Sequence, residues 1–171
     1  MKYYARNIED VFKKAAGQFR VLVLTGMRQT GKSTLLQHLF QKTHHYVSLD
    51  NPRYLKLAQE DPELFFDEYK EPLIIDEIQY APQLLRYIKI RVDRSGKRGQ
   101  FILTGSQQFT MIHNPRETLA GRVAIFHLLP MAVTEAKSAT QNYLYRGING
   151  SYPELMLRPN HILVKAKNCL Y

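Results

Sequence analysis

The sequence contains one cysteine and no tryptophan among its 171 residues. Because Cys169 has no second cysteine to pair with, an intramolecular disulfide is excluded, which suits a reducing compartment. No stretch approaches the roughly 18 uncharged apolar residues of a membrane span. Residues 1–19 hold no apolar core of the kind found in signal peptides. We therefore expect a cytoplasmic protein without a membrane partner.

Acidic residues are also in short supply. The chain has 24 lysines and arginines against 15 aspartates and glutamates, which gives a formal net charge of +9. This excess favours polyanionic partners such as nucleotides or nucleic acid, although a basic chain can also simply be well solvated. With 44% hydrophobic residues the chain can bury a packed core, so its length and composition predict one folded domain.

Internal repeats are absent from the sequence, and short apolar runs recur instead. They lie at residues 21–25, 46–49, 73–75, 101–104 and 123–128. Most are apolar at nearly every position, which is typical of strands covered on both faces. Helical patterns separate them at residues 35–40 and 84–92, and Asp61-Pro62 marks the start of a helix that reaches about Tyr69. The alternation predicts an α/β fold of three layers, with helices on both faces of a five-stranded, mainly parallel sheet.

The most specific motif is GMRQTGKS (26–33), which fits the phosphate-loop or Walker A pattern G-x-x-x-x-G-K-[ST] at every fixed position. Glycines let the backbone wrap a phosphate with several N–H groups pointing inward, and the following helix adds the positive end of its dipole. In this pattern Lys32 contacts the β- and γ-phosphates, and Ser33 is a ligand of Mg²⁺. The alternative is a glycine-rich turn with a surface lysine, but the flanking strand and helix favour a phosphate-loop NTPase fold. We expect the nucleotide to be bound by Gly26, Met27, Arg28, Gln29, Thr30, Gly31, Lys32, Ser33 and Thr34.

Two adjacent acids, Asp76 and Glu77, end the third apolar run. The carboxyl ends of parallel strands share one edge of a sheet, which is also the edge where the phosphate loop lies. We therefore expect Asp76, in the Walker B position, to hold Mg²⁺ together with Ser33. Glu77 is expected to polarise the attacking water as a catalytic residue, and the adjacent pair favours hydrolysis. The alternative is that both acids are merely solvated at the strand end.

The fourth apolar run ends in small hydroxyl residues, Thr104-Gly105-Ser106. A hydroxyl at this point would lie between the acids and the γ-phosphate and respond to the bound nucleotide. Either Thr104 or Ser106 can take this role, and we select Ser106. An ordinary exit from a strand is the alternative.

These motifs, in this order, resemble the AAA+-type predicted ATPases of bacteria and archaea. The matching segments are GMRQTGKSTLL (26–36), YVSLDNP (46–52), LIIDEIQ (73–79), FILTGSQ (101–107) and LAGRVAIFHLLPM (119–131). The resemblance implies that the nucleotide is ATP and that the sensor strand lies between the acid-bearing strand and the phosphate-loop strand. It also implies a catalytic role for Arg122 at a γ-phosphate, either in its own site or in a neighbour's. A surface ion pair is the alternative role for this arginine.

In that family the ATPase domain precedes a separate C-terminal domain, and GSYPEL (150–155) resembles the segment that leads into it. The resemblance therefore implies an ATPase domain at residues 1–148. It implies that residues 149–171 are a linker and the truncated start of a missing C-terminal domain. A homo-oligomer or a regulatory protein partner would then complete the activity.

A basic cluster raises the question of DNA as a further partner. It consists of Lys89, Arg91, Arg94, Lys97 and Arg98. Such residues can contact a phosphodiester backbone, although a solvated helix end is the alternative. The sequence thus predicts Mg²⁺-dependent ATP hydrolysis coupled to an unknown partner or domain. The rival functions are a truncated module that binds nucleotide or DNA without hydrolysis and a small-molecule kinase, which the paired acids disfavour.

Overall fold

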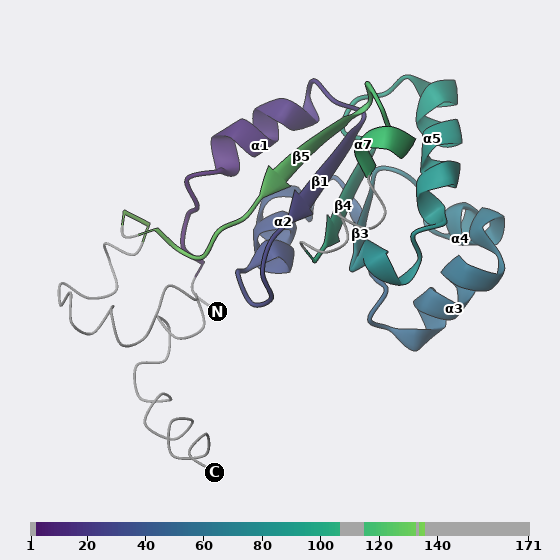
Figure 1. The fold of residues 1–171 in the computed structure, drawn as a ribbon, viewed down its shortest axis with the longest axis horizontal. Coiled ribbons are helices and arrows are strands. Elements are labelled where there is room, and N and C mark those ends of the chain that lie inside the picture. Colours follow the sequence, from purple (N-terminus) through teal and green to yellow (C-terminus); the bar gives the residue numbers. More distant parts are fainter. Residues whose placement is uncertain (1–2, 107–114, 133, 136–171) are drawn as a thin grey trace, which may run out of the picture.

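The computed structural model describes residues 3–106, 115–132, 134 and 135. Its centre is a sheet of five parallel strands in the order β2-β3-β4-β1-β5 (Figure 1). The strands are β1 (Val21–Thr25), β2 (His45–Ser48), β3 (Leu73–Asp76), β4 (Phe101–Gly105) and β5 (Val123–His127). The sensor strand β4 lies between the phosphate-loop strand β1 and the acid-bearing strand β3. The predicted fold class and this strand order are confirmed.

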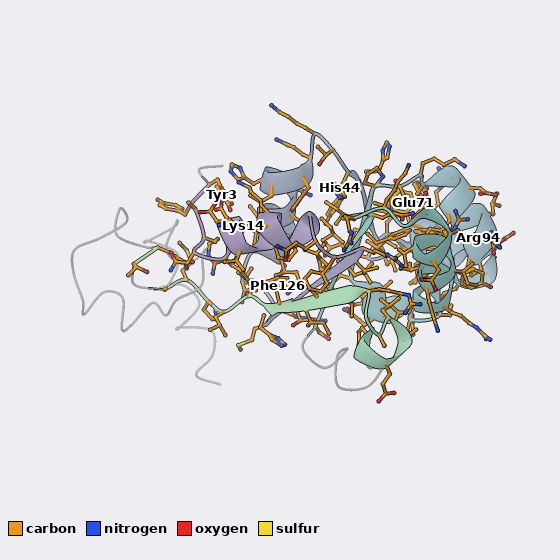
Figure 2. All side chains as sticks on the ribbon, turned by 90° about the horizontal axis from the view of Figure 1, so that it is seen from above. Tyr3, Lys14, His44, Glu71, Arg94 and Phe126 are labelled. Atoms are coloured by element: carbon orange, nitrogen blue, oxygen red, sulfur yellow. The ribbon has the colours of Figure 1, made fainter. Side chains whose placement is uncertain are left out.

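Alternate residues of the central strands face opposite layers of helices. Leu22, Leu24, Ile74 and Ile102 pack with residues of α1 (Glu9–Ala16) and α2 (Lys32–Phe40). The other face packs with α3 (Pro52–Glu60), α4 (Pro62–Glu68) and α5 (Leu84–Ser95). Figure 2 shows side chains filling the space between the sheet and the helices on either side. Burial on both faces explains why these strands are apolar at consecutive positions.

Two helices, α1 and α3, have no counterpart among the sequence predictions. α3 begins at an Asn51 cap, whose side chain accepts a hydrogen bond of 3.0 Å from the backbone N–H of Arg53, and Pro52 follows the cap. By contrast, α4 begins as predicted, because Asp61 caps it through the N–H of Leu64 and Pro62 follows. Two short helical turns complete the described elements, η1 (Ile78–Tyr80) and α7 (Pro115–Thr118).

The strands start and end in register, which defines two edges of the sheet. Val21 is paired with Phe101 and with Val123, so the amino ends of β1, β4 and β5 meet at one edge. Thr25 is paired with Gly105 and with His127 at the opposite, carboxyl edge. Within the described ranges, no helix has the length and apolar character needed to cross a membrane. The predicted linker at 149–171 lies outside the described residues.

Candidate nucleotide-binding site

The loop between β1 and α2 needs glycine at two positions. A Cβ atom on Gly26 would lie 2.4 Å from the backbone oxygen of Leu128, because the loop passes close to the segment that follows β5. Gly31 has a φ of 90°, in the left-handed region that favours glycine, and it directly precedes α2. The loop thus turns sharply into the amino end of a helix, where the first N–H groups have no helical partner.

Lys32 is buried against the loop that it follows. Its ammonium donates to the backbone oxygens of Gly26, at 3.1 Å, and Met27, at 3.0 Å. Burial lowers the pKa of Lys32, whereas the nearby carboxylates of Glu77 and Asp76 oppose this shift. The cation therefore lies between the loop backbone and the two acids, as a phosphate-binding lysine requires.

The other predicted loop residues divide by exposure. Thr30 is buried, and its hydroxyl donates to the backbone oxygen of Met27 at 2.9 Å, which closes the loop on itself. Met27, Arg28, Gln29 and Thr34 are exposed. These four residues are therefore accessible from solvent, the side from which a phosphate can approach the loop.

Asp76 is the centre of a hydroxyl cluster at the carboxyl edge. Ser33 Oγ, from the first turn of α2, donates to Asp76 Oδ2 at 2.8 Å. The hydroxyl of Tyr46 on β2 donates to the same oxygen, and the hydroxyl of Thr104 on β4 donates to Oδ1. Asp76 is only 4% exposed, so these donors replace the water that a surface carboxylate would bind. The predicted pair Ser33 and Asp76 is brought together.

This pair has the chemistry of a magnesium site. Mg²⁺ prefers oxygen ligands and usually binds through one or two carboxylates together with substrate phosphates and water. Ser33 Oγ and Asp76 Oδ2 offer two such oxygens next to the phosphate loop. The described part of the chain contains no cluster of three or more histidine, cysteine, aspartate or glutamate side chains able to hold a metal.

Glu77 is held by a residue that the sequence analysis did not single out. Its backbone is left-handed, with φ 59° and ψ 45°, which turns the chain sharply after β3. The side-chain amide of Gln79 donates to Glu77 Oε2, and Gln79 Oε1 accepts from the backbone N–H of Ser106 at 3.2 Å. Gln79 therefore links the second acid to the end of β4.

Thr104 contacts both acids through its hydroxyl, whereas Ser106 contacts Gln79 through its backbone N–H. The Thr104 hydroxyl donates to Asp76 and accepts from the backbone N–H of Glu77 at 3.2 Å. Thr104 is fully buried, and it is the penultimate residue of β4, the strand that lies between β3 and β1. Of the two hydroxyls considered as sensor, Thr104 has the closer connection to the acids, and the role of Ser106 stays a prediction.

Tyr46 is a second site residue that the sequence analysis did not select. Burial raises the pKa of its hydroxyl, and the hydrogen bond to Asp76 and the charge of that carboxylate raise it further. The hydroxyl therefore remains a donor to Asp76 at neutral pH. A tyrosine in an apolar strand usually serves core packing, so the sequence alone does not indicate a role in the site. The contact with Asp76 becomes visible once β2 is paired with β3.

Arg6 is the third addition, and it lies behind the phosphate loop. Its guanidinium donates to the backbone oxygens of Thr30, at 2.8 Å, and Leu129, at 2.7 Å. It also forms an ion pair of 3.1 Å with Glu135, and both side chains are 6% exposed. Glu135 accepts in addition from the backbone N–H of Asn7 at 2.7 Å. Arg6 thus fastens the N-terminal segment and the segment after β5 to the loop.

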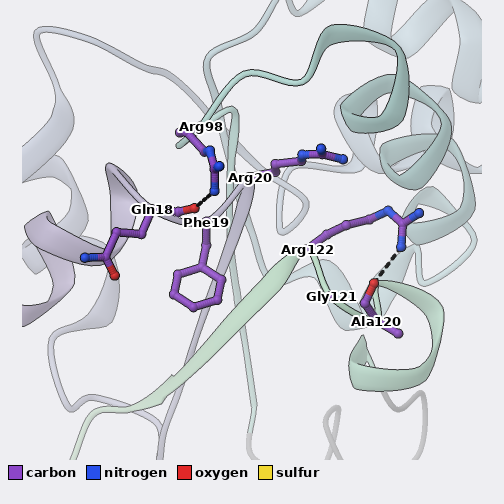
Figure 3. A pocket seen from close by; sticks show the side chains of 7 residues that line it. All are labelled: Gln18, Phe19, Arg20, Arg98, Ala120, Gly121 and Arg122. Atoms are coloured by element: carbon purple, nitrogen blue, oxygen red, sulfur yellow. Dashed lines mark hydrogen bonds between the residues drawn. The ribbon is translucent and has the colours of Figure 1, made fainter.

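Arg122 lies at the opposite edge of the sheet from the phosphate loop. Its backbone oxygen accepts from the N–H of Val21, the first residue of β1, whereas the loop follows the last residue of that strand. Its guanidinium pairs with Asp93 on α5, at 2.5 and 2.9 Å (Figure 3 shows its surroundings). This position keeps Arg122 away from a γ-phosphate on its own loop, which removes the first of the two alternatives left open for it. A role in a neighbour's site stays a prediction.

The basic cluster predicted around residues 89–98 is divided by the fold. Arg91 pairs with Glu63, Glu71 and Asp67 and lies over the ring of Phe66, with 4.8 Å from its guanidinium carbon to the ring centroid. In Figure 2, Arg94 lies on the same side of the molecule as Glu71. Only the following residues, Lys97 and Arg98, belong to the loop that leads into β4.

A phosphate loop after β1, an acid pair at the end of β3 and a strand, β4, between β1 and β3 define an ATPase-like nucleotide-binding domain. The chain belongs to the AAA domain family, whose model matches residues 18–137. Two curated relatives, an uncharacterized protein of Mycobacterium bovis and one of Mycobacterium tuberculosis, are each 31% identical to the chain over 159 residues. These matches cover 91% of this chain but 35% of each relative, so the chain spans about a third of their length.

Solved structures of similar fold include two ATP-related proteins. The Walker-type ATPase of Pyrococcus abyssi has a TM-score of 0.67 at 16% identity, covering 97% of this chain and 71% of that one. AMPPCP-bound DnaA from Aquifex aeolicus has a TM-score of 0.62 at 14% identity, and the match covers 94% of this chain and 59% of the DnaA chain. At these identities the likeness establishes the fold alone.

Proposed function

We propose that this domain binds a magnesium–ATP complex and hydrolyses the bond to its γ-phosphate. The observation that carries the proposal is the 2.8 Å hydrogen bond between Ser33 Oγ and Asp76 Oδ2. It joins the first turn of α2 to the end of β3, although 43 residues separate them in the sequence. A hydroxyl and a carboxylate joined in this way, beside a loop that offers backbone N–H groups, suit a metal-bound polyphosphate.

ATP is proposed as the nucleotide on the basis of the family. The chain matches the AAA domain model, and the ATP analogue AMPPCP is bound in the structurally similar DnaA. The curated relatives are longer than this chain, so we also propose that turnover is coupled to a further domain, a regulatory protein or another copy of the chain.

The binding roles follow from the contacts of three residues. Ser33 and Asp76 would hold Mg²⁺, which neutralises charge on the β- and γ-phosphates when it is bound. Lys32 now donates to two backbone oxygens of the loop, and phosphate oxygens would replace them as acceptors. Because the ammonium is already desolvated, its interaction with a phosphate costs little additional loss of water.

The hydrolytic role belongs to Glu77. Its carboxylate would accept a proton from a water molecule as that water attacks the γ-phosphate. Gln79 and Thr104 restrain this residue through its carboxylate and its backbone N–H, respectively. A base held at both points is positioned before the substrate arrives, which lowers the entropic cost of reaching the reactive geometry.

Equilibrium binding and phosphate release, measured on the same variants, test the proposal. Lys32→Ala should weaken the binding of a fluorescent ATP analogue by at least about tenfold, since one charge-assisted contact is worth about 1.5–3 kcal/mol. Glu77→Gln should keep that affinity and lower phosphate release by about 10²–10⁴-fold. Lys42→Ala, an exposed lysine just after α2, is the matched control and should change neither quantity. Equal affinity of the wild type and Lys32→Ala would refute the nucleotide site.

The same assay separates the two rival functions. A module that binds nucleotide without hydrolysis would bind the analogue and release no phosphate, with or without added DNA. A small-molecule kinase would release phosphate only slowly to water, and turnover would rise when an acceptor is supplied. Steady release with water as the only acceptor supports the hydrolytic assignment, which the adjacent acids Asp76 and Glu77 favour.

A further inference from the structure

The edge of the sheet opposite the nucleotide site carries a hollow of about 390 Å³ lined by three arginines, Arg20, Arg98 and Arg122 (Figure 3). They come from three separate loops, which lead into β1, β4 and β5. Because all strands are parallel, these three loops meet at one edge. The exposed ring of Phe19 belongs to the same lining.

Backbone hydrogen bonds hold the three loops together. The N–H of Gly99 donates to the oxygen of Phe19 at 2.8 Å, and that of Gln100 donates to the oxygen of Arg20 at 2.9 Å. The N–H of Val21 donates to the oxygen of Arg122 at 3.1 Å. A Cβ on Gly99 would lie 2.8 Å from the oxygen of Ala16, so the loops are closely packed. The arginine backbones therefore have fixed relative positions.

Positive charge in the hollow exceeds the negative charge that balances it. Arg20 pairs with Asp93 at 3.3 Å, and Arg122 pairs with the same carboxylate at 2.5 Å. Arg98 donates to the backbone oxygen of Gln18, which carries no charge. Two guanidinium groups thus share one exposed carboxylate and the third donates to a neutral oxygen, which leaves an excess of positive charge in the hollow.

The basic surface continues beyond the hollow. Lys13 and Lys14 lie in the last turn of α1, shortly before Gln18, and both are exposed. Lys97 precedes Arg98 and is also exposed. The segments that form the hollow are therefore flanked in the sequence by three further exposed lysines, and a chain of successive anionic groups needs several cations of this kind.

We propose that this amino edge of the sheet binds the phosphodiester backbone of single-stranded nucleic acid, with one phosphate among Arg20, Arg98 and Arg122. Guanidinium groups suit phosphate because their paired N–H donors match two of its oxygens. The exposed lysines in the flanking segments add cations that successive phosphates of a strand can use. Phe19, which is 36% exposed and belongs to the lining of the hollow, supplies an aromatic ring for base stacking, which favours a single strand over a duplex.

The proposal is tested by fluorescence anisotropy with a labelled 20-nucleotide single strand of mixed sequence. The wild type should bind it, and the affinity should fall as salt rises. Arg98→Glu should weaken binding by about tenfold or more and reduce the slope of log affinity against log salt by about 0.7 or more. Arg53→Glu, an exposed arginine on α3 with the same change of charge, should have little effect. Phe19→Ala should weaken single-strand binding more than duplex binding.

Unchanged ATP-analogue affinity and circular dichroism would show that Arg98→Glu is folded, because the hollow and the phosphate loop lie at opposite edges of the sheet. Equal weakening by Arg98→Glu and Arg53→Glu would overturn the proposal, since it would indicate attraction to net charge alone. A poly-glutamate peptide that binds as tightly as the single strand would assign the surface to an acidic protein. Failure of the wild type to bind any strand, with ATPase activity lost in Arg122→Ala, would assign the arginines to a neighbouring subunit's nucleotide instead.

Discussion

The guanidinium of Arg6 donates to the backbone oxygen of Thr30, inside the phosphate loop, at 2.8 Å. The same group donates to Leu129 and pairs with Glu135, which both follow β5. One buried cation therefore connects the segment before α1, the phosphate loop and the segment after β5. Loop geometry and the position of that last segment are coupled through this contact.

Removal of this cation should destabilise the fold and the loop together. Arg6→Ala leaves the buried carboxylate of Glu135 without its cation and the Thr30 oxygen without its donor, so we expect a loss of about 3–5 kcal/mol in the free energy of unfolding. ATP-analogue affinity should also fall in the variant under conditions where it remains folded. Urea denaturation and analogue titration measure the two effects.

Glu135→Gln provides a milder comparison, because it keeps the shape of the side chain and loses its charge. It should weaken stability less than Arg6→Ala, since the glutamine oxygen can still accept hydrogen bonds. Normal ATP affinity in a folded Arg6→Ala protein would mean that the contact supports the fold alone.

Gly26 should tolerate no side chain. In Gly26→Ala the new methyl group would lie 2.4 Å from the Leu128 oxygen, so either the loop or the segment after β5 must move. We expect a loss of ATP-analogue binding, measured by titration. Gly96→Ala is the matched control, because Gly96 also has a positive φ, of 65°, but nothing lies within 4 Å of its added Cβ. It should cost only backbone strain of about 1 kcal/mol and leave ATP affinity unchanged.

The sequence predicts well those elements and residues that are marked by a pattern within one short segment of the chain. β1 and β4 are buried on both faces and so read as continuous apolar runs. Lys32 and Ser33 lie at fixed spacing within one loop, and Asp76 ends one strand. In contrast, α3 does carry an apolar face of Tyr54, Leu55, Leu57 and Ala58, but this short face lies directly before Asp61-Pro62, and the sequence analysis started a helix only there.

The contacts that sequence analysis missed act across the sheet. Tyr46 reaches Asp76 from β2, and Arg6 reaches Thr30 from a segment with no motif. Thr104 was considered but not selected, and it reaches Asp76 from β4. No spacing within the chain encodes these contacts. Arg122 is a different case, because the residue directly precedes the run at 123–128. A residue before a parallel strand lies at the amino edge, so the sequence already argued against a role in its own site.

Acid should destabilise the protein partly through His44. Burial lowers the pKa of this imidazole, and the hydrogen bond of 2.8 Å with the Gly99 oxygen offsets only part of that shift. Because the pKa of His44 is lower in the folded state than in the unfolded state, folding favours the neutral imidazole. This contribution to stability is complete above the unfolded pKa, near 6.5, and is lost as the pH falls below that value. The free energy of unfolding should therefore decline from pH 7 to pH 5. His44→Gln, which retains an N–H donor, should flatten this decline, and His45→Gln, on the exposed neighbour, should leave it unchanged.

Thr104 and Ser106 offer a direct comparison of the two sensor candidates. Thr104→Val keeps the shape of a fully buried side chain but removes the donor to Asp76 and the acceptor for the N–H of Glu77. Loss of a hydrogen bond to a charged group is worth about 1.5–3 kcal/mol, so ATP turnover should fall by roughly tenfold or more. Ser106→Ala leaves the backbone contact with Gln79 in place and should reduce turnover much less. Phosphate release at saturating ATP measures both variants, and the opposite order would return the sensor role to Ser106.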